Sequence, residues 1–209
     1  MKIDLHVHTS ERSACGKAAE DEVIHTALEQ GLDGLAFTDH GRLPPPGHLE
    51  RLRERCGPLR LFTGIEIRVA DEDFLVLGLH HPLLERTDWR YDDLHAFARD
   101  SGGFLVLAHP YRFADSLTVD IEARPPDAVE VRSVHIPPSA ADRIHALADR
   151  LGMRLLANSD AHFASSVGTF YNVLDAAPDT DADLVAALRN RPVSCASNAA
   201  RVQALGLAI

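Results

Sequence analysis

The sequence predicts an α/β protein in which parallel β-strands are covered by helices. Strand-like and helix-like segments alternate about seven times, and the strand-like segments are almost continuously apolar. Strands of a parallel sheet show such apolar runs because helices bury both of its faces. An open doubly wound sheet and a closed barrel both fit this pattern. No glycine-rich phosphate loop follows the first strand, which weakens the dinucleotide-binding form of the open sheet.

The individual elements follow from apolar periodicity and from the residues that end each segment. In the clearest helix, apolar residues recur on one face and Gly152 ends it. We expect strands at residues 2–7, 34–38, 59–69, 74–79, 104–108, 128–131, 153–157 and 170–174, and helices at 20–30, 48–56, 91–100, 139–151 and 181–190. We also expect a short helix within 111–126, and a short strand and a loop in the tail from residue 192. No repeat, linker or low-complexity tract divides the chain, so one domain is expected over residues 1–209.

Composition restricts the environment and the partners. A chain that is 45% hydrophobic and 25% charged is typical of a soluble globular protein, and no apolar run approaches the ~20 residues that cross a bilayer. The N-terminus does not resemble a signal peptide, and the three cysteines are few and odd in number, which favours a reducing cytoplasm. The net charge of −10 disfavours binding to an extended nucleic acid. It remains compatible with a small phosphorylated substrate held by metal ions.

Histidine and carboxylate side chains stand at the carboxyl ends of the expected strands. His6 and His8 share one face of the first strand because side chains alternate with period two. The full set is His6 and His8, Asp39 and His40, Glu66, His80, His109, and Asp160 and His162. In a parallel barrel these strand ends converge, and imidazole and carboxylate groups are ligands for Zn²⁺, Mn²⁺ or Fe²⁺. A single residue of this kind is commonly structural, whereas the joint pattern indicates a metal site.

The segments that carry these residues resemble, in order, the motifs of the polymerase-and-histidinol-phosphatase (PHP) superfamily. The segments are Asp4–Thr9, Thr38–His40, Gly64–Glu66, Ala108–Pro110 and Ser159–His162, and the resemblance spans about residues 1 to 175. It implies a distorted (β/α)7 barrel that holds two or three divalent metal ions (Zn, Mn or Fe). It also implies hydrolysis of phosphate esters such as histidinol phosphate, nucleotides or nucleic-acid strand ends.

Three metal positions follow from the resemblance, residue by residue. The first would use His6, His8, Glu66 and Asp160; the second would share Glu66 and add His80 and His109; the third would use His40 and His162. His81 could replace His80, since the two are adjacent. Family members often carry Asp or His shortly after the first motif. Here Glu11 or Cys15 could substitute, or the third position could be weak or absent.

The mechanism expected from this arrangement is attack on phosphorus by a metal-bridging hydroxide. His40 or His162, where not committed to a metal, could protonate the leaving oxygen. Arg112 and Arg42 each follow a site histidine closely and could clamp the phosphate, although a solvent-facing position is equally compatible with the sequence. His135 is retained as a substrate contact, and Glu130 faces either the site or solvent.

The sequence favours a phosphoesterase acting on a small phosphorylated metabolite. Alternatives are a nuclease that trims oligonucleotides and a non-catalytic module that holds metals for binding. A metal-dependent amidohydrolase also begins with a His-x-His strand. Such enzymes often use a bridging lysine, and the only lysines, Lys2 and Lys17, stand at no strand end. The exact substrate, the physiological metal and the oligomeric state are left open by the sequence.

Overall fold

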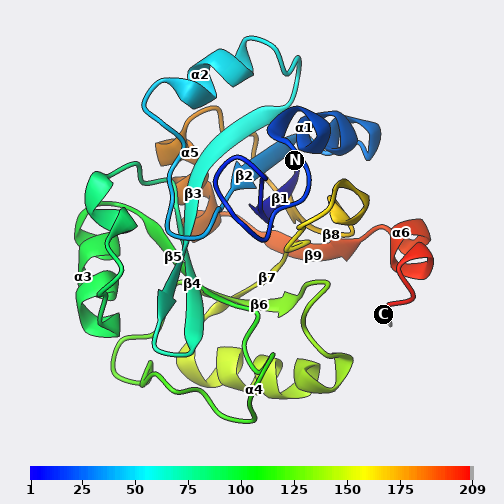
Figure 1. Ribbon diagram of the computed structural model, residues 1–209. Helices are drawn as coiled ribbons and strands as arrows, with labels where there is room; N and C mark the ends of the chain where they lie inside the picture. The colour runs from blue at the N-terminus through cyan, green and yellow to red at the C-terminus, as the bar shows by residue number, and fades with distance from the viewer. Residues whose placement is uncertain (208–209) are drawn as a thin grey trace.

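One sheet of nine strands curves into a nearly closed barrel in the computed structural model, which describes residues 1–207 (Figure 1). Neighbouring strands follow the order β7-β6-β5-β4-β3-β2-β1-β8-β9. The strands are β1 (Lys2–Val7), β2 (Gly34–Phe37), β3 (Arg60–Val69), β4 (Glu72–Leu77), β5 (Phe104–Ala108), β6 (Ala128–Arg132), β7 (Arg154–Ala157), β8 (Phe170–Leu174) and β9 (Val193–Ser197). The α-helices are α1 (Glu20–Glu29), α2 (His48–Arg53), α3 (Tyr91–Asp100), α4 (Ala141–Leu151), α5 (Asp181–Asn190) and α6 (Ala199–Ala204), with short 3₁₀ turns at Pro82–Glu85, Pro138–Ala140 and Ala164–Ser166.

The predicted α/β barrel is confirmed, but its strands are not all parallel. Strands β1, β2 and β3 are parallel, as are β5, β6 and β7, whereas β4 and β8 run antiparallel to both of their neighbours. The reason for β4 is the length of its connection. Val69 pairs with Glu72, so only Ala70 and Asp71 lie between β3 and β4. A parallel crossover needs a dozen or more residues, so this two-residue turn forces a hairpin.

Side-chain amides bridge the seam between β7 and β8. The two strands share no backbone ladder within residues 1–207. Instead, the Ala157 N–H donates to Asn172 Oδ1 at 3.0 Å, and Asn172 Nδ2 donates to the Ala157 carbonyl at 2.8 Å. Asn158 Oδ1 accepts from the Leu5 N–H at 3.1 Å and so ties β1 to the same seam. These bonds satisfy backbone groups that would otherwise be buried without partners.

The core has an inner cluster, two outer clusters, and a small fourth cluster of Ala157, Phe170 and Val202. The inner cluster combines residues of strands β1 to β8 with Leu184 and Leu188 of α5. The outer clusters lie between the sheet and α3 with α4, and between the sheet and α1 with α2, so helices surround the barrel in Figure 1. Helix α5 is anchored through Asp181, whose carboxylate accepts from the Thr63 N–H and hydroxyl at 2.8 Å each. It therefore plugs the end of the barrel at which β3 begins, and leaves the other end open for polar residues.

Two local expectations differ from the structure. Residues 111–126 contain turns and bends but no helix, and the tail forms α6 after β9. Asn198 begins α6, because its side chain accepts from the Arg201 N–H at 3.3 Å. The last two residues of the expected tail, 208–209, lie outside the described chain. Within the described chain, no helix is long and apolar enough to span a membrane.

Candidate metal centre

Imidazole and carboxylate side chains gather at the open end of the barrel. The structure brings together seven of the predicted site residues: His6, His8, His40, Glu66, His109, Asp160 and His162. Glu66 lies at the centre, because its Oε2 is 3.2 Å from His8 Nε2 and 3.1 Å from His40 Nδ1. Its Oε1 is 3.0 Å from His109 Nε2. Asp160 faces it, with Oδ1 3.2 Å from His8 Nε2.

Two of these residues have an unusual backbone conformation. Asp160 has a φ of 51° and His109 a φ of 25°, both in the left-handed region that non-glycine residues rarely occupy. Contacts from β1 hold the Asp160 turn in place: the Ser159 N–H donates to Asp4 Oδ1 at 3.0 Å, and the His8 N–H donates to the Ala161 carbonyl at 2.9 Å. The barrel, rather than local preference, therefore sets the direction of the Asp160 side chain.

Burial and mutual charge shift the pKa values of the cluster strongly. Burial opposes the charge of every member, but the opposite charges outweigh it for the innermost groups. The pKa of His8 is raised to about 9 because burial is overcome by Asp160 and Glu66, and the pKa of His6 is raised by Glu130, Asp160 and Glu66. The same contacts lower the pKa values of Glu66 and Asp160. Without a metal, these contacts therefore favour ionised Glu66 and Asp160 beside the innermost imidazoles, although His6 Nε2 and His8 Nε2 lie only 3.1 Å apart and cannot both carry a proton.

The donor set fits divalent metal ions. Glu66 Oε2 and Asp160 Oδ2 are buried and accept no well-formed hydrogen bond within residues 1–207, so a cation would satisfy both. The candidate ligand atoms lie within 4.8 Å of one another in several overlapping groups: His6, His8 and Glu66; His6, His109 and Asp160; His40, Glu66 and Asp73; His135, Asp160 and His162; and His8, Cys15, His40 and His162. Nitrogen and oxygen ligands in this mixture suit Zn²⁺, Mn²⁺ or Fe²⁺.

Glu130 lies beneath this cluster and is fully buried. Its Oε1 is 2.9 Å from His6 Nδ1 and accepts from Asn158 Nδ2 at 2.7 Å, while its Oε2 accepts from the His109 N–H at 2.9 Å. A hydrogen bond at His6 Nδ1 fixes the tautomer and leaves Nε2 free for a metal. The sequence left open whether Glu130 faces the site or solvent, and the structure shows that it faces the site.

His80 does not join the cluster. It is exposed, and its Nε2 lies 2.8 Å from the Pro44 carbonyl. The physical reason is that β4 is antiparallel, so its carboxyl end points away from the open end of the barrel. His81 does not replace it, because its Nδ1 accepts from the Leu83 N–H at 3.2 Å.

Asp73, at the amino end of β4, occupies the position expected for His80. Its carboxylate is buried, and Oδ2 lies 3.9 Å from His109 Nε2. Burial and the nearby Glu66 carboxylate raise the pKa of Asp73 to about 6. Asp73 was not predicted from the sequence, although the short connection between β3 and β4 indicates that β4 is antiparallel. Such a turn makes β4 antiparallel and brings its first residues to the site.

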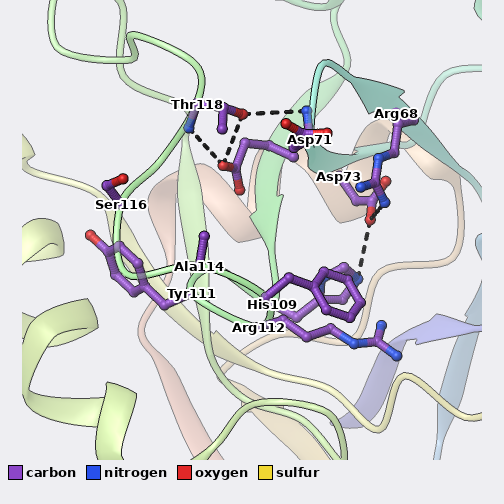
Figure 2. Close-up of a pocket in the computed structure, with 11 residues that line it drawn as sticks. Arg68, Asp71, Asp73, His109, Tyr111, Arg112, Ala114, Ser116 and Thr118 are labelled. Carbon is purple, nitrogen blue, oxygen red and sulfur yellow. Dashed lines mark hydrogen bonds and ion pairs between the residues drawn. The ribbon is translucent and has the colours of Figure 1, made fainter.

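Arg112 lies at the edge of the cluster, with one terminal guanidinium nitrogen 3.7 Å from Asp160 Oδ2. It lines a cavity of about 300 Å³ together with Arg68, Asp73 and His109, and Figure 2 shows these side chains around the opening. Arg42 is exposed, and no hydrogen bond or ion pair of its side chain is found within residues 1–207. The structure thus places Arg112, but not Arg42, where it could contact a bound phosphate.

Of three further side chains considered from the sequence, His135 and Cys15 lie at the cluster and Glu11 does not. His135 Nδ1 lies 3.1 Å from Asp160 Oδ2, and burial lowers the pKa of this histidine to about 4. Cys15 joins the group with His8, His40 and His162. Glu11 turns away and accepts from the Glu20 N–H at 3.1 and 3.2 Å, at the start of α1.

The fold and this cluster together define an α/β barrel with a candidate metal centre at one end. Residues 4–117 match the family described as the PHP domain, and residues 138–193 match the PHP-associated family. The first match covers more than half of the chain, and the chain therefore belongs to the PHP family.

The chain is also similar to a curated protein and to several solved structures. A protein of Syntrophotalea carbinolica named as a probable phosphatase is 28% identical over 210 aligned positions, covering 84% of this chain and 86% of that protein. PsfC from Pseudomonas syringae has a TM-score of 0.73 at 20% identity, with 97% of this chain and 93% of that chain covered. An amidohydrolase from Chromobacterium violaceum, solved with bound sulfate and no metal, has a TM-score of 0.60 at 18% identity over 78% of this chain and 88% of that chain. A candidate metal-dependent phosphoesterase from Bifidobacterium adolescentis has a TM-score of 0.57 at 17% identity, with the same coverage. The solved structures share the fold.

Proposed function

We propose that this protein is a metal-dependent phosphoesterase that hydrolyses a phosphate ester of a small metabolite. One observation carries the proposal. The buried carboxylates of Glu66 and Asp160 face a ring of imidazoles directly beside an arginine-lined cavity. Membership of the PHP family and the relative named as a probable phosphatase support the same reaction class.

In this proposal the metal ligands divide into three sets, of which the first two share Glu66. His6, His8, Glu66 and Asp160 hold one ion, and Glu66 with His109 and Asp73 holds a second. His40 and His162 belong to a third set. Ions held by these residues would supply positive charge near the phosphoryl oxygens and would activate water for attack on phosphorus.

The other residues of the site bind the substrate and move a proton. Arg112 is only 26% exposed and offers its guanidinium between the cluster and the cavity, where it would hold two phosphoryl oxygens. Burial lowers the pKa values of His40 and His162 and so favours their neutral rings, the form that binds a metal ion. If the third position is empty, one of the two rings donates a proton to the leaving oxygen; if it is filled, both rings are ligands and neither acts as the acid. His135, beside Asp160, contacts the substrate.

The size and charge of the molecule favour a small substrate. A cavity of about 300 Å³ is at the lower end of the range for ligand pockets, and the net charge of −10 opposes binding to a long polyanion. The three free cysteines are compatible with a reducing cytoplasm, where we place the protein.

A phosphoester panel tests the proposal. Purified protein loaded with Zn²⁺, Mn²⁺ or Fe²⁺ should release phosphate from at least one small monoester. Asp160→Asn should lower turnover by more than about 100-fold, since even residues behind the ligands commonly contribute 10–100-fold. The matched control is Asp88→Asn, because that carboxylate is 78% exposed and its one ion pair within residues 1–207 is with Arg86.

Other outcomes would contradict the proposal. Loaded, folded protein without turnover on any ester would indicate a non-catalytic metal-binding module. Release of mononucleotides from a short oligomer, without activity on small monoesters, would indicate a nuclease. Equal turnover by Asp160→Asn and Asp88→Asn would remove Asp160 from the reaction.

A further inference from the structure

We propose that Cys15 supplies a thiolate ligand, which makes the third metal position a mixed sulfur–nitrogen site completed by His40 and His162. This inference rests on the proposed function only in requiring a metal centre at this end of the barrel. It names a soft donor among ligands that are otherwise nitrogen and oxygen.

The side chains are close enough to share one ion. The candidate ligand atoms of Cys15, His40, His162 and His8 all lie within 4.8 Å of one another. The Nε2 of His8 lies 3.2 Å from both Glu66 Oε2 and Asp160 Oδ1, so this ring belongs to the first position. His40 approaches Glu66 Oε2 through Nδ1, at 3.1 Å, which leaves its Nε2 for the third position. Cys15, His40 and His162 remain for the third.

The tautomer of His162 suits this role. Its Nδ1 lies 3.0 Å from the Asp160 carbonyl oxygen, which can only accept a hydrogen bond. The proton is therefore on Nδ1, and the lone pair of Nε2 is available for a metal. The ring of His8 packs against both partner rings, with centroid separations of 4.7 Å to His40 and 4.4 Å to His162, so their planes are restrained.

The loop that carries Cys15 is tied to both histidines by its backbone neighbours. Ser13 Oγ accepts from the His40 N–H at 2.9 Å, and the Lys17 N–H donates to the His162 carbonyl at 2.7 Å. Cys15 is the residue midway between these two ties. The placement of its side chain therefore depends on the same backbone that places the imidazoles.

A buried carboxylate fixes the first half of this loop. Asp39 accepts from the Thr9 N–H at 2.7 Å, from the Thr9 hydroxyl at 2.9 Å and from Arg12 Nε at 2.8 Å. Gly16 packs so closely that a Cβ there would lie 2.5 Å from the Thr9 carbonyl group. These contacts restrain the loop without an ion, which would reduce the entropy lost when Cys15 binds a metal.

Glu11 and Cys15 are the two candidate metal ligands in this loop, and only the Cys15 side chain is free to bind an ion. Glu11 is engaged with the Glu20 N–H at the start of α1, on the outer side of the loop. Cys15 is partly exposed and can be reached by an incoming ion.

The ligand chemistry has a consequence for the choice of metal. One thiolate and two imidazoles leave a fourth position open, as in zinc sites with three protein ligands. Sulfur donors favour Zn²⁺, Fe²⁺ and Co²⁺ over Mn²⁺ and Mg²⁺. The third position would therefore select a softer ion than the carboxylate-rich positions beside it.

Cobalt spectroscopy tests the proposal directly. Full-length metal-free protein titrated with Co²⁺ should develop the near-ultraviolet charge-transfer band of a cobalt–thiolate bond. Cys15→Ser and Cys15→Asp should both lose this band, and Cys15→Asp should still bind cobalt through its carboxylate. Cys195→Ser is the matched control and should keep the band, because Cys195 is exposed on β9 and belongs to no group of candidate ligands within residues 1–207.

A second measurement needs no variant. Alkylation of the native chain, followed site by site by mass spectrometry, should show that Zn²⁺ abolishes labelling of Cys15 and leaves labelling of Cys195 unchanged. A charge-transfer band that persists in Cys15→Ser would overturn the proposal. So would cobalt-loaded native protein that lacks the band, or Zn²⁺-loaded protein in which Cys15 is still alkylated.

The two hypotheses fail in different ways. A cobalt–thiolate band without turnover of any phosphoester would refute the proposed function and leave the Cys15 site intact. Phosphoester turnover without the band, and without protection of Cys15, would refute only the thiolate ligand.

Discussion

Glu130 contacts three different parts of the centre and reaches no solvent. It binds His6 through Nδ1, His109 through the backbone N–H, and Asn158 through the side-chain amide. In the proposed metal centre, Glu130 would therefore orient His6 and His109 rather than bind the metal itself. A carboxylate behind a metal-bound histidine raises the basicity of the ring and holds its direction.

Replacement of Glu130 by Gln should weaken metal binding by about 10–100-fold without unfolding the protein. The amide keeps the shape of the side chain but removes the charge that favours a proton at His6 Nδ1. Competition with a chromophoric chelator measures the affinity. The control is Glu50→Gln, because that carboxylate is 66% exposed on α2 and should have no effect. Equal affinities of the two variants would show that Glu130 does not orient His6.

At the level of single residues, the sequence predicted most of the cluster but not all of it. His6, His8 and Asp160 were predictable because each ends a strand or follows one directly. Asp73 was not, since it begins a strand whose direction was misjudged. The choice between Glu11 and Cys15 depends on which side of a loop each residue faces, and spacing does not encode that.

At the level of elements, the barrel depends on one asparagine at its seam. Asn172 is fully buried and gives Ala157 a donor and an acceptor in place of a neighbouring strand. Helix periods and strand runs predicted most elements to within a few residues, as for the helix expected at 139–151 and found at Ala141–Leu151. The direction of β4 and the amide seam were not predicted, because both depend on how strands meet across space.

Asn172→Ala should lower the free energy of unfolding by about 1–3 kcal/mol or more, because it leaves the buried N–H and carbonyl of Ala157 unpaired. Urea unfolding, followed by far-ultraviolet circular dichroism, measures the change. Asn190→Ala is a suitable comparison, since that exposed amide only donates to a carbonyl within its own helix. A loss no larger than that of Asn190→Ala would mean that the seam is held by other contacts.

At the level of the whole molecule, the charged cluster links folding to pH. The folded pKa of His8 is raised to about 9, above the value of 6.5 expected for an unfolded chain. A group with a raised pKa stabilises the fold fully below its unfolded pKa and loses that contribution as the pH rises through its folded pKa. His6 and His109 are shifted in the same direction.

Metal-free protein should therefore lose stability between about pH 6.5 and pH 9, the window set by His8. Metal-loaded protein should behave differently, because only the neutral ring binds an ion and binding displaces the proton. Its Tm should exceed that of the metal-free form by a margin that grows with pH. Thermal unfolding across this range, with and without Zn²⁺, measures both trends. A margin that shrinks as the pH rises would contradict the protonation states inferred for the cluster.

The left-handed turn at Asp160 depends on contacts with the start of the chain, so the site is completed only when both ends of the chain have come together. Its supports, Asp4 and His8, belong to the opposite end of the chain, about 150 residues away in sequence. An excised peptide spanning this turn would therefore relax to a common backbone conformation, and the Asp160 side chain would no longer be held toward the other site residues. During synthesis the proposed metal centre would stay incomplete until the late strands have docked on β1, so its full ligand set would bind ions only after assembly, and bound ions would then connect the first and last segments of the chain.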